Sequence, residues 1–145
     1  MKIRNGFVSN SSSSSFVLIM KNGKELSKET LLESFDVKET SPLYSFSKDL
    51  THWIINNVKE YDIKGIHDNY VGNYNKKPLT IDDMINEIIQ EGYRLTREEL
   101  EKIKNKEYRY YEGSASNDSG EGIEDYLYSK DFNVETDIIS IKCDD

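Results

Sequence analysis

The sequence predicts an α+β fold: a small three-stranded sheet, antiparallel or mixed, covered on one face by three to four helices. Three observations support this prediction. The chain has 145 residues, which is enough for one domain with a sizeable core. Apolar, partly β-branched segments near both ends have the composition of strands, and the middle of the chain repeats its apolar residues at helical spacing. We therefore expect a single domain over residues 1–145, opening with a serine-rich segment at residues 1–15.

The first strand and helix are predicted near the N-terminus. Residues 16–20 are uninterruptedly apolar and end at a turn signal, Asn22 followed by Gly23, as a buried strand would. Ser27 is a suitable N-cap for a short helix, because its hydroxyl can accept a free backbone N–H of the first turn. Pro42 then interrupts the chain.

The clearest helical pattern begins at Ser45 or Ser47. Its apolar residues lie three or four positions apart and form one stripe, namely Leu50, Trp53, Ile54, Val58 and Tyr61. Residues 65–78 are polar and rich in Asn, Gly and Tyr, a composition that predicts a loop.

Two further helices are predicted from the residues at their ends. Thr80 is a suitable N-cap, and Gly92 a suitable C-terminal stop, for a helix whose core face consists of isoleucine and methionine. Thr96 and Glu99 have the spacing of a capping box, in which each side chain accepts the backbone N–H of the other. A short helix through Ile103 should follow.

The C-terminal part of the chain returns to strand-like patterns. Residues 108–112 alternate as a strand does, and residues 134–142 contain three isoleucines and predict a final strand. Between them, residues 114–122 are small and acidic and predict a loop, and residues 123–128 predict one or two helical turns.

The opening of the chain carries its one distinctive motif. Residues 6–16 read Gly-Phe-Val-Ser-Asn, then a run of serines, then Phe16. This string resembles an N-terminal segment found on many uncharacterised proteins of phages, bacteria and archaea. The resemblance implies no settled activity, but it points to a phage or mobile-element setting.

Three interpretations of the serine run stay open. The hydroxyls and backbone N–H groups could cradle an anion through Ser11, Ser12, Ser13 and Ser14, although phosphate loops normally need more glycine than this segment has. The run could be a flexible polar segment that is modified or recognised by a partner. It could also be structural, with hydroxyls satisfying backbone groups in a turn that leads into the strand. We favour the structural interpretation, because apolar residues precede the run.

The sequence offers no convincing catalytic or metal-binding set. Cys143 is followed by two aspartates, which would raise its thiol pKa and oppose nucleophilic attack. His67 and Asp68 could pair with a distant serine, but no nucleophile elbow is present. Residues 117–125 gather oxygen ligands without the spacing of a calcium loop. We therefore predict no catalytic residue, no metal and no cofactor, and we favour a binding role over an enzymatic one.

The net charge of the chain limits the classes of molecule that it can bind. Nineteen Lys and Arg oppose twenty-seven Asp and Glu, giving a formal net charge of −8, which argues against nucleic-acid binding. The local basic stretch at residues 102–109 is interleaved with glutamates, as on a solvated helix face. No apolar run approaches the roughly 20 residues of a membrane helix. We expect a protein of the cytoplasm of a bacterial host.

These observations predict a phage or mobile-element accessory protein that binds a host protein or complex, with inhibition of a defence system, as by anti-CRISPR proteins, as the favoured role. Tyrosine and acidic side chains would form the contact surface. The predicted binding residues are Tyr70, Tyr74, Tyr108, Tyr110, Tyr111, Asp118, Glu121, Glu124 and Asp125. The alternatives are an anion-binding module that uses the serine run, and a structural protein of a virion or assembly.

Overall fold

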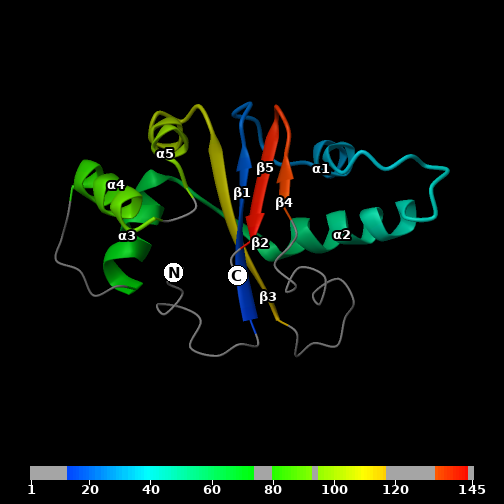
Figure 1. The fold of residues 1–145 in the computed structure, drawn as a ribbon, viewed down its shortest axis with the longest axis horizontal. Helices are drawn as coiled ribbons and strands as arrows, with labels where there is room; N and C mark the ends of the chain where they lie inside the picture. Colours follow the sequence, from blue (N-terminus) through cyan, green and yellow to red (C-terminus); the bar gives the residue numbers. More distant parts are fainter. Residues whose placement is uncertain (1–12, 74–79, 93–94, 117–132, 144–145) are drawn as a thin grey trace.

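The computed structural model describes residues 13–73, 80–92, 95–116 and 133–143 (Figure 1). Within these residues the chain forms five helices and five strands, more of each than the sequence predicted. In chain order they are β1 (Ser13–Met20), α1 (Lys28–Ser34), α2 (Tyr44–Asn57), β2 (Val58–Tyr61), α3 (Ile63–Asn73), α4 (Ile81–Gln90), α5 (Arg97–Lys104), β3 (Arg109–Ser116), β4 (Asn133–Glu135) and β5 (Ile139–Cys143).

The strands form one antiparallel sheet in the order β2-β3-β1-β5-β4. The prediction of three strands was wrong because the two edge strands are short. β2 directly continues helix α2, and β4 is only three residues long. The predicted single strand at residues 134–142 is a hairpin: the hydroxyl of Thr136 accepts the N–H groups of Ile138 and Ile139, and this turn separates β4 from β5.

Helices cover both faces of the sheet, with α1 and α2 on one side and α3, α4 and α5 on the other (Figure 1). The predicted arrangement, with helices on one face, was therefore wrong. The reason lies in β1, the central strand. Phe16, Leu18 and Met20 point into the core under α1 and α2, whereas Ile19 points into the core under the other three helices. A strand buried on both faces is a continuous apolar run, as residues 16–20 are.

Helix α3 occupies most of the segment that was predicted to be a loop. Its first turn is capped by Asp62, whose carboxylate accepts the N–H of Gly65 at 2.8 Å. Ile66 and Tyr70, one turn apart, are both buried in the core beside α4. The helix is weakly amphipathic and polar in composition, so tertiary packing stabilises it more than intrinsic propensity does.

The boundary between α2 and β2 also differs from the prediction. The apolar stripe was expected to continue through Val58 and Tyr61 in one helix. The helix begins at Tyr44, slightly before the predicted start, and ends at Asn57, whose side-chain amide donates to the carbonyl of Trp53 at 2.7 Å. Val58 is already extended, and it pairs with Gly113 in β3. Pairing with β3 therefore overrides the helical periodicity here.

The helix ends predicted from capping residues at Ser27, Thr80, Gly92 and Thr96 are confirmed. Ser27 and Thr80 each accept a backbone N–H in the first turn of α1 and α4. Thr96 and Glu99 form the predicted capping box of α5. Gly92 has a φ of +74° just after α4, a conformation that glycine adopts without strain. Residues 114–116, predicted to begin a loop, belong to β3. The rest of that predicted loop and the helical turns predicted at residues 123–128 lie outside the described residues.

Thr51, on the buried side of α2, has the one buried side-chain polar atom in the described residues that makes no hydrogen bond. An unsatisfied buried hydroxyl costs about 1 to 3 kcal/mol. We therefore expect Thr51→Val, which keeps the shape and removes the hydroxyl, to stabilise the protein by about 1 kcal/mol in urea unfolding. Thr30→Val is the matched control, because the Thr30 hydroxyl accepts from Ser27 and its removal should not stabilise. Destabilisation by Thr51→Val would contradict the assignment.

Candidate functional site

A groove of about 520 Å³ lies between the end of α1, the first half of α2 and the edge strand β4. Its lining is apolar on the helical side and polar along the strand. The lining residues are Ser34, Phe35, Val37, Leu43, Phe46, Ser47, Leu50, Asn133, Val134, Glu135 and Thr136. Two of them are large apolar side chains with unusual exposure, Leu43 at 63% and Phe46 at 36%.

The local sequence explains why these apolar side chains are exposed. Asp36 has a φ of +54° and turns the chain away at the end of α1. A turn at Ser41 then leads into α2. The Ser41 hydroxyl accepts the N–H of Leu43 at 3.1 Å, and the Ser41 carbonyl accepts the N–H of Tyr44 at 3.0 Å. Leu43 is thereby held at the N-cap of α2, where its side chain makes no capping bond and faces solvent.

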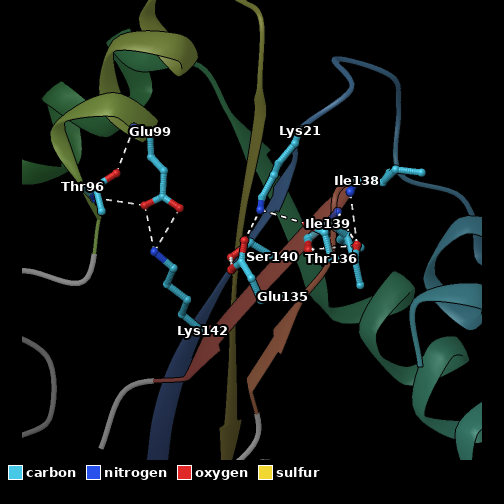
Figure 2. A network of polar contacts seen from close by, with 9 residues as sticks. All are labelled: Lys21, Thr96, Glu99, Glu135, Thr136, Ile138, Ile139, Ser140 and Lys142. Carbon is cyan, nitrogen blue, oxygen red and sulfur yellow. Dashed lines mark hydrogen bonds and ion pairs between the residues drawn. The ribbon is translucent and has the colours of Figure 1, made fainter. Parts of the chain in front are cut away.

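The opposite face of the sheet, over β5 and β4, carries a network of polar contacts (Figure 2). Lys142 donates to both carboxylate oxygens of Glu99, at 2.8 and 2.9 Å, and the two side chains are only 19% and 11% exposed. Glu99 also accepts the N–H of Thr96 in the capping box. One carboxylate therefore caps α5 and joins it to β5.

A second part of the same network holds the β4–β5 hairpin. Glu135 forms an ion pair with Lys21 and accepts the hydroxyl of Ser140 at 2.8 Å. Burial opposes ionisation of Glu135, but the bonds from Lys21 and Ser140 outweigh it and hold the pKa of this carboxyl below its usual range. Ser140 is fully buried, so its hydroxyl is unsuited to attack a substrate. The network is structural.

Three of the predicted binding tyrosines are buried, so they are not part of an exposed surface. Tyr70, Tyr110 and Tyr111 are 3 to 6% exposed. The hydroxyl of Tyr111 connects β3 to the segment before α1, where it accepts the N–H of Leu26 at 3.0 Å, and the hydroxyl of Tyr110 donates to Glu112 of the same strand at 2.7 Å. Large aromatic rings stabilise a small core when a polar partner satisfies the hydroxyl, and sequence alone does not distinguish that use from binding.

Tyr70 links α3 to α4. Its hydroxyl lies 3.2 Å from a carboxylate oxygen of Glu87 and 3.1 Å from one of Glu91, one helical turn apart. Burial and the two carboxylates raise the pKa of Tyr70 well above its usual range, so the phenol remains a neutral donor.

The other predicted binding residues are placed as follows. Tyr108 is half-buried, with the ammonium group of Lys102 5.3 Å from its ring centre. Ser13 and Ser14 lie in β1, where they pair with Ser116 and Ala115, so β1 begins inside the serine run. The remaining candidates lie outside the described residues and stay predictions, namely Tyr74, Asp118, Glu121, Glu124, Asp125, Ser11 and Ser12.

Three cations of the basic stretch form ion pairs. Lys102 lies 3.7 Å from Glu98, Lys104 lies 2.8 Å from Asp82, and Arg109 lies 3.3 Å from Glu60. Glu98 is a neighbour on the same helix, as the interleaved charges of the sequence indicated, whereas Asp82 and Glu60 belong to α4 and β2.

The histidines form no catalytic arrangement in the described residues. His67 and Asp68 are neighbours on α3 whose closest nitrogen and oxygen are 3.5 Å apart. His52 is exposed and contacts Asn56. In the same residues no group of three or more His, Cys, Asp or Glu side chains could hold a metal ion.

Sequence reasoning missed the groove. Phe46 lies one turn before Leu50 and reads as part of the apolar stripe of α2, and Leu43 precedes the predicted helix. Only the path of the chain between α1 and α2 shows that both side chains reach solvent.

No helix of the described residues is long and apolar enough to cross a membrane. Comparison of the chain with protein-family models, curated proteins and solved structures finds no match.

Proposed function

We propose that this chain acts by binding another protein, and that the groove between α1, α2 and β4 is its contact surface. The observation that carries the proposal is the exposure of Leu43 and Phe46 at a groove of about 520 Å³. Contiguous exposed apolar side chains bordered by polar groups are typical of interaction sites. The N-terminal resemblance supports a finer proposal, in which the chain is a phage or mobile-element accessory protein and the partner a host protein whose defence function it inhibits.

Covering the groove removes the remaining exposed area of Leu43 and Phe46 from water. Fully burying a leucine or phenylalanine side chain contributes about 1.5 to 3 kcal/mol, and these two side chains are 63% and 36% exposed, so covering both contributes about 2 kcal/mol. They would act as a small apolar anchor, and further contacts around the groove would offset the cost of association.

The test is affinity capture from a bacterial host lysate with three forms of the tagged protein. The wild type is compared with the double variant Leu43→Ser and Phe46→Ser. The matched control is Asn86→Ser with Gln90→Ser, because both side chains are exposed on α4, across the sheet from the groove. Any host protein that the wild type enriches is then purified and its Kd measured against all three forms.

We expect the groove variant to weaken the Kd by about tenfold or more, because it removes apolar area from the contact. The control should bind as the wild type does. Equal binding by the wild type and the groove variant would rule out this groove as the contact surface. Inhibition is tested separately, by adding the chain to the purified partner and measuring the partner's own activity.

A further inference from the structure

Hydrogen bonding in the β4–β5 hairpin fixes the direction of the β4 backbone groups. Thr136 N–H donates to the carbonyl of Ile139 at 2.8 Å, so these two residues form a bonded pair. In an antiparallel ladder, bonded pairs alternate with pairs that exchange no bond. Asn133 and Glu135, opposite Lys142 and Ser140, occupy the pairs without bonds. Their N–H and C=O groups therefore point outward, away from β5.

The other side of β5 agrees with this assignment. Lys21 N–H donates to the carbonyl of Ile138 at 2.7 Å, and alternation from that pair makes Ile19 and Ser140 a bonded pair. Ser140 thus bonds toward β1 and leaves Glu135 free to bond outward. No other hydrogen bond of the described residues uses the backbone of Asn133 or Glu135.

The two edges of the sheet are not equivalent. At the β2 edge, Lys59 and Glu60 are exposed charges, a common protection against strand addition. The β4 edge instead borders the groove, and Val134 points to the same face as the apolar residues of α1 and α2. An edge strand beside an apolar groove under a helix is the geometry that accepts an extended peptide.

The two faces of β4 differ in character. Val134 lies on the apolar groove face, whereas Glu135 projects to the other face, because successive side chains of a strand point to opposite faces. There Glu135 is paired with Lys21 and accepts the hydroxyl of Ser140. A segment added to this edge therefore needs apolar residues at the positions that share the face of Val134 and polar residues at the others.

We infer that the partner docks as an added antiparallel strand on the outer edge of β4, through a segment that alternates apolar with polar residues. The partner residue opposite Val134 points to the same face as Val134, into the groove, so it and its alternate neighbours are apolar. The residues opposite Asn133 and Glu135 point to the other face and exchange backbone bonds with β4. This inference rests on the proposed function, and it specifies the residue pattern of the partner segment that binds.

The probe is a fluorescein-labelled synthetic nonapeptide in which valine alternates with lysine or threonine. Its binding is measured by fluorescence polarisation. We expect saturable binding. Two N-methylated forms of the peptide test which of its backbone N–H groups bond to β4. Methyl groups on the lysine and threonine nitrogens block the N–H groups that face β4 and should abolish binding. Methyl groups on the valine nitrogens point away and should leave it unchanged.

A protein variant tests the same bonds from the other side. Asn133→Pro removes an outward N–H and no bond to β5, and proline is tolerated at such edge positions. Its control, Asn133→Ala, keeps the N–H. We expect the proline variant to weaken peptide binding by about five- to tenfold, as the loss of one net backbone hydrogen bond does, and the alanine variant to have little effect. If Asn133→Pro does not fold, the methylated peptides still test whether the peptide adds to β4 as a strand.

The outcomes separate this inference from the proposed function. Equal binding by the two methylated peptides, or no saturable binding of the unmethylated peptide, would overturn strand addition. If the host protein's Kd nevertheless depends on Leu43 and Phe46, the groove remains the contact surface and only the docking mode is wrong. If the Kd of the host protein does not depend on Leu43 and Phe46, the proposed contact surface itself is wrong.

Discussion

Gly113→Ala is expected to destabilise the protein by about 3 kcal/mol, although alanine is ordinarily better than glycine inside a strand. A Cβ at this position would lie 2.6 Å from Phe16 Cζ and 2.8 Å from the carbonyl oxygen of Asn57. Phe16 is 1% exposed and packed in the core, so its ring has little room to move. The other contact is backbone at the end of α2, which must shift with β2. Urea unfolding with an unchanged m value would measure the effect.

Two companion variants make this prediction specific. Ser114→Ala, next in the same strand, is exposed and should change the free energy of unfolding by less than about 0.5 kcal/mol. Gly113→Ala combined with Phe16→Leu should be less destabilised than the sum of the single variants, because the smaller side chain relieves part of the clash. A stable Gly113→Ala protein would mean that the ring does not lie across this glycine.

Glu99→Ala is expected to cost about 2 to 3 kcal/mol, the largest effect among the exchanges of charged residues considered. It removes the acceptor of the Thr96 N–H in the capping box, for which about 1 kcal/mol is typical. It also removes the carboxylate that Lys142 contacts with both oxygens in a largely buried setting. Glu99→Gln should lie between the wild type and alanine, because its side-chain oxygen can still cap the helix.

The neighbouring residue provides the control. Glu98 is exposed and lies 3.7 Å from Lys102 on the same helix, an arrangement for which less than about 0.5 kcal/mol is expected. A double-mutant cycle of Glu99→Gln with Lys142→Met should give a coupling free energy of about 1 kcal/mol or more. Additive effects would show that the ion pair contributes nothing beyond the cap.

The comparison of Glu99 with Tyr70 shows how far sequence reasoning reached. The capping box was predictable from Thr96 and Glu99 because both partners lie within one helical turn. Lys142, the second partner of Glu99, is 43 residues away along the chain and was not predictable. Tyr70 was predicted to be a binding residue in a loop, whereas it lies in helix α3 with its hydroxyl between the carboxylates of Glu87 in α4 and of Glu91, which follows α4. A tyrosine has the same composition in either role, and only its neighbours decide between them.

The candidate site shows the same division. The exposure of Leu43 and Phe46 depends on how the chain passes from α1 to α2, and the outward N–H and C=O groups of Asn133 and Glu135 depend on the register of β4 against β5. A shift of one residue in that register would reverse which groups point outward. Neither property is encoded in a short motif.

The sequence by itself determined the α+β class, a buried strand at residues 16–20, and the beginnings of the helices at Ser27, Thr80 and Thr96, because caps and apolar patterns act over a few residues. The tertiary structure alone decided that β1 is covered on both faces, that residues 63–73 form a helix, and that short strands complete both edges of the sheet. These features arise where the burial of apolar surface by distant segments outweighs local propensity, and that free energy exists only once the chain has folded.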